Sequence, residues 1–149
     1  MSEDALRSYV REALGPWGVL HRVENAVDVG TPDLAYVLRA GIQKSAPVAS
    51  GWIELKHATR WPARPTTPLV IEHLTLDQVL FAERWARAGG WCWALLQVGR
   101  EYLLLDPPTL RGLFERRFRG RDIEAAATAV GPTRLPVGTV LRALTGGMG

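Results

Sequence analysis

Two charged residues interrupt an apolar stretch of the chain, and they limit its possible folds more than any other feature. The segment "GWIELKHA" (51–58) favours an extended strand, whose side chains alternate between two faces. Ile53 and Leu55 therefore point into a core, whereas Glu54 and Lys56 lie together on the opposite face. A carboxylate and an ammonium group on such a strand cost desolvation free energy unless they are paired or used. The strand thus predicts either a surface ion pair or a functional site.

The overall composition is that of an ordinary globular protein. A length of 149 residues predicts one domain with its own core. No apolar run approaches the roughly 18 residues of a membrane span, and "MSEDALRSYV" lacks the features of a signal peptide. Cys92 is the only cysteine, so we expect no intramolecular disulfide and no structural zinc site built on several thiolates. These features favour a cytoplasmic protein of a bacterium or a phage-infected host.

The charge is modestly positive, and arginine supplies most of it. The formal net charge of +3 permits a polyanionic partner such as nucleic acid. Only Lys44 and Lys56 of the 18 basic residues are lysines, so the lysine of "ELK" stands out. Many arginines and prolines with few asparagines, methionines and cysteines are typical of a thermophilic source.

The succession of predicted elements indicates an α/β domain with a mixed sheet. The patterns predict a helix at 2–15, strands at 18–24, 33–40 and 51–58, a helix at 74–90, strands at 91–99 and 101–108, a helical segment at 109–130 broken near Gly120, and a short helix in the tail. A turn-rich connection is expected at 25–32, and a hairpin-like loop at 41–50. The loop at 59–73 is long for a compact domain, and long ordered loops are often functional.

Two carboxylates are predicted to converge on adjacent strands. Asp33 follows the turn residues "GTP" at the start of a strand, and Glu54 lies on the next strand. If the two strands pair as a hairpin, two carboxylates, a backbone carbonyl and water form a reasonable Mg²⁺ site. Lys56 would lie beside the ion, where it could hold a phosphate oxygen, orient water or stabilise developing charge.

These motifs resemble those of a known enzyme superfamily. "GTPD", then "IELK", then a helix beginning "TLDQ" resembles the PD-(D/E)XK nucleases, over about residues 3 to 106. Within that superfamily the chain is most similar to the VRR-NUC and archaeal-type Holliday junction resolvase branches. The resemblance implies a restriction-endonuclease-like core of the order αβββαβ, here followed by a helical C-terminal extension over 107–149.

The resemblance also implies roles for individual residues. Asp33 and Glu54 would bind one or two Mg²⁺ ions, for which Mn²⁺ can substitute, and the backbone carbonyl of Leu55 would add a ligand. Lys56 would help to activate water, with Gln78 as a nearby polar helper. An acid from the first helix is usual, and the candidates here, in order, are Glu3, Glu12 and, from the end of the first strand, Glu24.

Two segments are candidates for DNA contact. "HATRWPAR" mixes groups suited to phosphate contact and base stacking, namely His57, Arg60, Trp61 and Arg64. The alternative is a solvated loop with Trp61 packed as an anchor and His57 as a strand-end residue. The C-terminal region carries a basic cluster that could follow a phosphate backbone, or form a solvated helix face: Arg111, Arg116, Arg117, Arg119 and Arg121. Trp85, Trp91 and Trp93 are expected in the core or at a dimer contact.

The sequence therefore predicts a Mg²⁺-dependent endodeoxyribonuclease. The preferred substrate is a four-way DNA junction, whose two symmetric cuts require a homodimer. One alternative is a VRR-NUC-like repair or phage nuclease that acts on flaps, nicks or single strands, and another is a DNA-binding module with a decayed site. No nucleotide cofactor is expected, because the sequence has no dinucleotide fingerprint or glycine-rich phosphate loop.

Overall fold

One six-stranded sheet organises the molecule. The computed structural model describes residues 2–24 and 30–146. The strands lie side by side in chain order: β1 (Gly18–Arg22), β2 (Leu34–Arg39), β3 (Val48–Ala58), β4 (Cys92–Val98), β5 (Glu101–Leu105) and β6 (Ala129–Gly131). Neighbouring strands are antiparallel except β3 and β4, which are parallel. The mixed sheet and the hairpin of β2 with β3 are as predicted.

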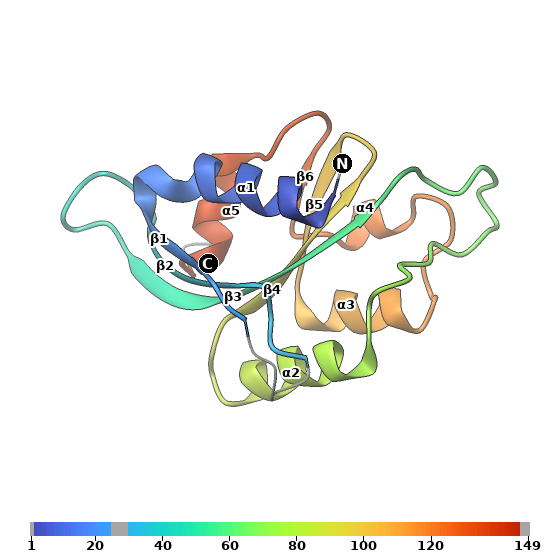
Figure 1. Cartoon of the computed structure of the whole chain (residues 1–149), viewed down its shortest axis with the longest axis horizontal. Coiled ribbons are helices and arrows are strands. Elements are labelled where there is room, and N and C mark those ends of the chain that lie inside the picture. Colours follow the sequence, from blue (N-terminus) through green and yellow to red (C-terminus); the bar gives the residue numbers. More distant parts are fainter. Residues whose placement is uncertain (1, 25–29, 147–149) are drawn as a thin grey trace.

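Helices cover both faces of this sheet (Figure 1). The helices are α1 (Glu3–Leu14), α2 (Leu76–Arg87), α3 (Pro107–Phe114), α4 (Ile123–Ala126) and α5 (Val137–Leu144), with a short 3-10 helix η1 at Gly15–Trp17. Helices α1 and α5 pack on one face around Leu34, Ile53 and Leu104. Helices α2, α3 and α4 pack on the other face, around Leu96 and Leu103. The predicted α/β architecture and αβββαβ order are therefore confirmed.

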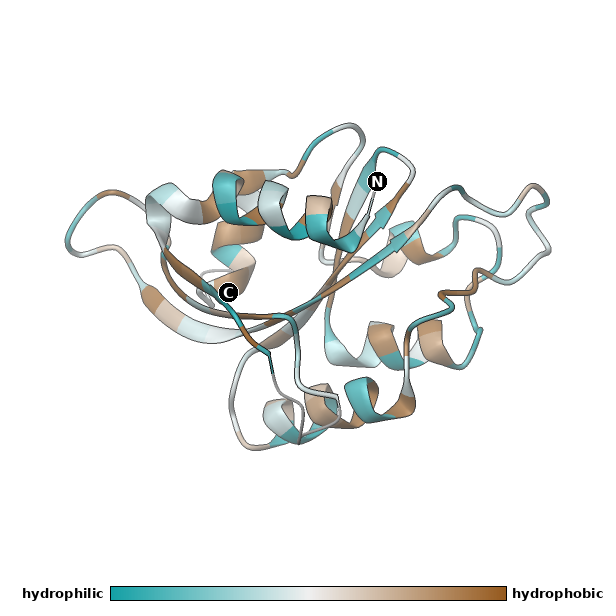
Figure 2. Cartoon of the chain, viewed as in Figure 1, coloured by the Kyte–Doolittle hydropathy of each residue, from teal (hydrophilic) through white to brown (hydrophobic). Residues whose placement is uncertain are grey.

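Local sequence signals explain the best-defined elements. Ser2 caps α1 by accepting a hydrogen bond from the Ala5 N–H (3.1 Å), and α1 buries an apolar stripe that includes Leu6 and Val10. Every residue of β4 is buried, because helices cover the sheet on both sides. Figure 2 shows the result, with hydrophobic residues gathered on the central strands.

The C-terminal region differs from the helical extension that the sequence predicts. Helix α3 begins at Pro107, where Asp106 caps it by accepting the Thr109 N–H (2.9 Å), so the strand predicted at 101–108 ends at Leu105. Helix α3 ends at Phe114, and α4 is a single turn. The alanine-rich run that follows favours a helix locally, but its end forms β6 against β5. Pairing with the open edge of β5 outweighs that local preference.

Of the two predicted loops, one is shorter than expected and the other is as expected. Strand β3 begins at Val48, so the hairpin loop is shorter than the predicted 41–50. Residues 59–73 form the predicted long loop, without helix or regular strand but with a bridge between Pro68 and Arg119. Most of the predicted connection at 25–32 lies outside the described residues. Among the helices that the structure describes, none is long and apolar enough to cross a membrane.

Candidate active site

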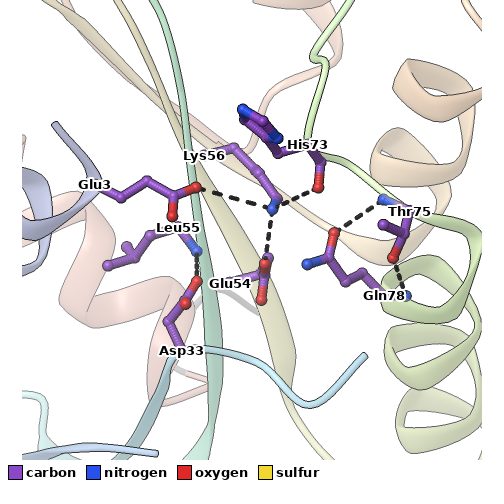
Figure 3. Close-up of polar contacts among 8 residues, drawn as sticks. All are labelled: Glu3, Asp33, Glu54, Leu55, Lys56, His73, Thr75 and Gln78. Atoms are coloured by element: carbon purple, nitrogen blue, oxygen red, sulfur yellow. Dashed lines mark hydrogen bonds and ion pairs between the residues drawn. The ribbon is translucent and has the colours of Figure 1, made fainter. Parts of the chain in front are cut away.

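The pairing of β2 with β3 brings Asp33 to Glu54, as predicted. The last residue pair between the two strands is Leu34 with Ile53, so Asp33 lies just beyond the end of β2. Its Oδ2 accepts a hydrogen bond from the backbone N–H of Leu55 at 2.8 Å (Figure 3). The Asp33 side chain thus takes the place of a strand partner, which fixes its carboxylate beside the middle of β3.

The backbone carbonyl of Leu55 faces the same edge of β3 as its N–H group. In a strand the N–H and C=O of one residue point to the same side, and the Leu55 N–H points to Asp33. Strand β2 has ended there, so no β2 residue pairs with Leu55. The Leu55 carbonyl is therefore directed to the same edge of β3 as the Asp33 carboxylate.

Glu54 and Lys56 form a buried ion pair. Each residue is only 4% exposed, and the Lys56 Nζ lies 3.1 Å from Glu54 Oε1. Lys56 Nζ also donates to the backbone carbonyl of His73 at 2.9 Å (Figure 3). The alternative of a surface ion pair is therefore wrong. The carboxyl group of Glu54 and the ammonium group of Lys56 are both removed from water, as the strand pattern implies.

The surroundings of Glu54 favour its neutral form when no cation is present. Burial, followed by the negative charge of Asp33, raises the pKa of the Glu54 carboxyl to about 8, although Lys56 opposes the shift. Glu54 Oε2 is buried and has no hydrogen-bond partner within the described structure. A buried carboxylate oxygen without a partner requires an explanation, and a cation between Glu54 and Asp33 would supply both a partner and neutralising charge.

These groups fit a divalent cation of the Mg²⁺ type. In the described part of the chain, no group of three or more His, Cys, Asp or Glu side chains is arranged to hold a metal ion. The candidate set is instead two carboxylates, Asp33 and Glu54, with the Leu55 carbonyl. Mg²⁺ is often bound in this way, by one or two carboxylates with substrate and water completing its coordination.

Of the three acids considered as helpers, only Glu3 lies at this site. Its Oε1 is 4.0 Å from the Lys56 Nζ, and its charge also contributes to the raised pKa of Glu54. Glu24 is exposed and forms a 2.7 Å ion pair with Arg22. Glu12 lies near the opposite end of α1 from Glu3 and lines a separate pocket against β1.

Gln78 has a structural role besides that of the polar helper expected of it. It forms a capping box at the start of α2, where its Oε1 accepts the Thr75 N–H at 3.0 Å. Its backbone N–H donates to Thr75 Oγ1 at 3.3 Å. The amide nitrogen of Gln78 points to the Glu54 side of the site (Figure 3), so capping leaves that group available.

The loop residues proposed for DNA contact differ in their surroundings. His57 and Arg60 line a pocket next to the buried pair, whereas Arg64 is exposed in the middle of the loop. Trp61 instead anchors the loop, because its Nε1–H donates to Glu101 at 3.1 Å and the Arg121 guanidinium lies 4.7 Å from the centre of its ring. The predicted base-stacking role of Trp61 is thus not favoured, and the anchoring alternative describes its position.

The C-terminal arginines also divide. Arg111 forms a two-point ion pair with Glu83 (2.9 and 2.6 Å), Arg117 pairs with Glu115 (2.7 Å), and Arg121 pairs with Glu101 and Glu124. Arg116 and Arg119 are exposed and form no ion pair with any described residue. Arg117 was expected among the DNA contacts, but it is already paired with Glu115. Arg116 and Arg119 are therefore the better candidates for DNA contact.

The tryptophans divide between the predicted core and the surface. Trp93 is buried in the core and stacks on Trp91, with ring centres 6.3 Å apart. Trp85 and Trp91 are each 40% exposed and line a surface pocket with Val48. Strand β4 itself is thus core, and only the residue before it reaches the surface.

Sequence reasoning missed two backbone groups at the site. The His73 carbonyl binds Lys56, and the Leu55 N–H binds Asp33. Backbone contacts of this kind have no residue-type signature. The only sequence signal for His73 is its place at the end of the long loop, two residues before the capping threonine of α2.

The mixed six-stranded sheet with helices on both faces gives the chain a restriction-endonuclease-like α/β fold. Among solved structures it is similar to Hjc, a Holliday junction resolvase from the archaeal hyperthermophile Archaeoglobus fulgidus. The TM-score is 0.54 at 16% sequence identity, over 94% of this chain and 99% of the archaeal one. No protein-family model matches the chain, and no curated protein matches its sequence.

Proposed function

We propose that the protein is a Mg²⁺-dependent endodeoxyribonuclease that hydrolyses phosphodiester bonds in branched DNA, with the four-way junction as its first substrate. The observation that carries the proposal is the buried Glu54–Lys56 pair with Asp33 at the end of the neighbouring strand. The shared fold with a solved Holliday junction resolvase supports the choice of a junction.

In this proposal each residue has a distinct task. Asp33, Glu54 and the Leu55 carbonyl would hold the Mg²⁺ ion, which supplies Lewis-acid stabilisation of phosphate charge and lowers the pKa of water. Lys56 has its ammonium group fixed by Glu54 and the His73 carbonyl, so it is already oriented before substrate arrives. It would stabilise negative charge on the phosphate or orient the attacking water. The expected product carries a 5′-phosphate.

Junction resolution also implies a homodimer. A four-way junction is resolved by two symmetric cuts, and each chain contributes one such acidic site. A two-fold dimer would present two sites in a fixed relation.

A cleavage assay tests this function directly. End-labelled four-way junction, 5′-flap, single strand and linear duplex are incubated with the protein in Mg²⁺ and in EDTA. Paired symmetric nicks restricted to the junction and dependent on Mg²⁺ are the expected result. Cutting of flaps or single strands would move the protein to the repair-nuclease alternative, and no metal-dependent cutting of any substrate would leave the non-catalytic DNA-binding alternative.

Variants then connect the activity to the site. Asp33→Asn, Glu54→Ala and Lys56→Ala are each expected to lower the cleavage rate by about a hundredfold or more, because each removes an interaction at the reacting phosphate. DNA binding, measured in Ca²⁺ to prevent cutting, should remain for Lys56→Ala within about tenfold. Retained cleavage by purified Glu54→Ala protein would falsify the proposed site.

A further inference from the structure

A pocket with one arginine, two histidines and one glutamate in its lining adjoins the buried Glu54–Lys56 pair through His57 and His73. It lies where the end of β3 meets the two ends of the long loop, and its lining residues are His57, Ala58, Thr59, Arg60, Val70, Glu72 and His73. His57 follows Lys56 in β3, and the carbonyl of His73 accepts the Lys56 hydrogen bond at 2.9 Å. A group bound in the pocket would therefore neighbour any phosphate held by Lys56.

The lining residues suit a phosphate group. The side chains of His57, Arg60 and His73 all carry N–H donors, and a guanidinium can donate two parallel hydrogen bonds to phosphate oxygens. In the described chain no carboxylate lies within ion-pair distance of Arg60, in contrast to Arg111, Arg117 and Arg121. The charge of Arg60 is thus available to a ligand. Glu72 is the single acid in the lining, and it opposes anion binding.

Hydrogen bonds hold the loop in place on both sides of the pocket. Next to Arg60, Trp61 donates to Glu101 at 3.1 Å, with Arg121 over its ring. Farther along the loop, the Leu69 N–H donates to the Phe118 carbonyl (2.9 Å) and the Gly120 N–H donates to the Thr67 carbonyl (2.8 Å). At the far end, Lys56 holds the His73 carbonyl. Such preorganisation lowers the entropy cost of binding.

We infer that this pocket binds the phosphodiester next to the cleaved one on the same DNA strand, with Arg60 as its main contact. The inference rests on the proposed nuclease function, and it identifies where that function takes the neighbouring nucleotide. Arg60 would make a contact to one defined phosphate, whereas a loop arginine outside the pocket would contribute only to general attraction.

Arg64 provides a matched control for Arg60. Both are exposed arginines of the same loop, but only Arg60 lines the pocket. Dissociation constants for a four-way junction are measured in Ca²⁺ for the wild type, Arg60→Ala, Arg60→Lys and Arg64→Ala. Arg60→Ala should raise Kd by about tenfold and Arg60→Lys by less, since a charge-assisted contact is lost or only altered. Arg64→Ala should change Kd by less than about threefold.

Replacing single DNA phosphates by an uncharged group identifies the phosphate that Arg60 contacts. Junctions are prepared with a single uncharged methylphosphonate at each position around the cleaved bond, which is mapped beforehand with the wild type in Mg²⁺. At one position adjacent to that bond, the methylphosphonate should weaken wild-type binding but leave Arg60→Ala binding unchanged, because the two changes remove the same interaction. Glu72→Gln should tighten binding by a factor of about two to five, since it removes the opposing charge.

The result that would overturn the inference is also specific. The inference is wrong if Arg60→Ala and the methylphosphonate weaken binding independently at every position. It is also wrong if Arg64→Ala raises Kd as much as Arg60→Ala does. Circular dichroism of each variant confirms that the fold is kept, and the opposite sign of the Glu72→Gln effect does not depend on any loss of folding. Cleavage by the wild type is recorded in parallel, so failure of the nuclease function is seen there. If the wild type does not cut, methylphosphonates are placed at every position around the junction centre, and the pocket is judged by whether Arg60→Ala is coupled to one of these phosphates.

Discussion

At the scale of single residues, the central feature is a buried contact between a carboxyl and an ammonium group, both of which are costly to remove from water. Glu54 and Lys56 are both buried, and one oxygen of Glu54 has no partner among the described residues. Two apolar side chains of similar volume would pack against β4 at least as favourably, because removing charges from water is expensive. The pair is therefore better explained by chemistry than by stability.

The raised pKa of Glu54 predicts a pH dependence of stability in the metal-free protein. Its pKa is about 8 in the folded chain, against an ordinary value of 4.5. Between these values the folded chain keeps a proton that the unfolded chain releases, so the stability from this group is complete below pH 4.5 and is lost as pH rises through 8. The expected loss is on the order of a few kcal/mol.

Urea unfolding in EDTA from pH 5 to pH 9 measures this effect. Wild type should lose unfolding free energy across the interval, and Glu54→Gln should show a flatter profile because Gln does not titrate. All other titrating groups are common to both proteins, so the difference isolates Glu54. Parallel profiles would mean that the Glu54 carboxyl is ionised in the folded protein at neutral pH.

At the scale of elements, the start of α2 combines a cap with a candidate active-site residue. Thr75 and Gln78 form a capping box, and the free amide nitrogen of Gln78 points to the Glu54 side (Figure 3). A glutamate at this position keeps the capping geometry, since Glu and Gln both serve there. It does not keep the amide donor, and it adds a negative charge beside Glu54.

The Gln78→Glu variant should therefore separate the two roles. Its unfolding free energy should stay within about 0.5 kcal/mol of wild type. The cleavage rate should fall at least tenfold, because the amide donor is lost. Thr75→Ala is the matched control, with about 1 kcal/mol lost from stability and cleavage nearly unchanged. Wild-type cleavage by Gln78→Glu would show that Gln78 is only a cap.

The long loop at 59–73 depends on Trp61 for its position. The indole donates to Glu101, stacks under Arg121 and packs against the core around α2 and α3. Trp61→Ala should lower the unfolding free energy by about 1–3 kcal/mol, and Arg64→Ala should change it by less than about 0.5 kcal/mol. Chemical denaturation measures both. Unchanged stability with weakened DNA binding would instead assign Trp61 to base stacking.

At the scale of the whole molecule, the described residues of one chain form one candidate site around Asp33 and Glu54, and the proposed reaction needs two. We expect a homodimer with twice the 16.4 kDa mass of a single chain. Sedimentation velocity at the concentrations used for cleavage measures this mass. A monomer that nevertheless makes paired nicks would contradict the expectation, because it would have to act twice in succession without a fixed two-fold arrangement.

Much of the fold could be predicted from local patterns. The apolar run of β4, the alternation in β3 and the caps of α1 and α2 are periodic or short-range signals, and the structure confirms the elements that they predict. The end of the chain could not be predicted in this way. Strand β6 exists because β5 offers an unpaired edge, and an alanine-rich sequence does not contain that information.

The same division holds for the candidate site. Side-chain alternation and a hairpin connection are enough to place Asp33, Glu54 and Lys56 together, so their meeting can be predicted from local patterns. The acid that joins them, the carbonyl that binds Lys56 and the arginines that remain unpaired became known only from the packed chain. A strand fixes the direction of its own side chains, whereas partners from a distant helix or loop depend on how the whole chain packs.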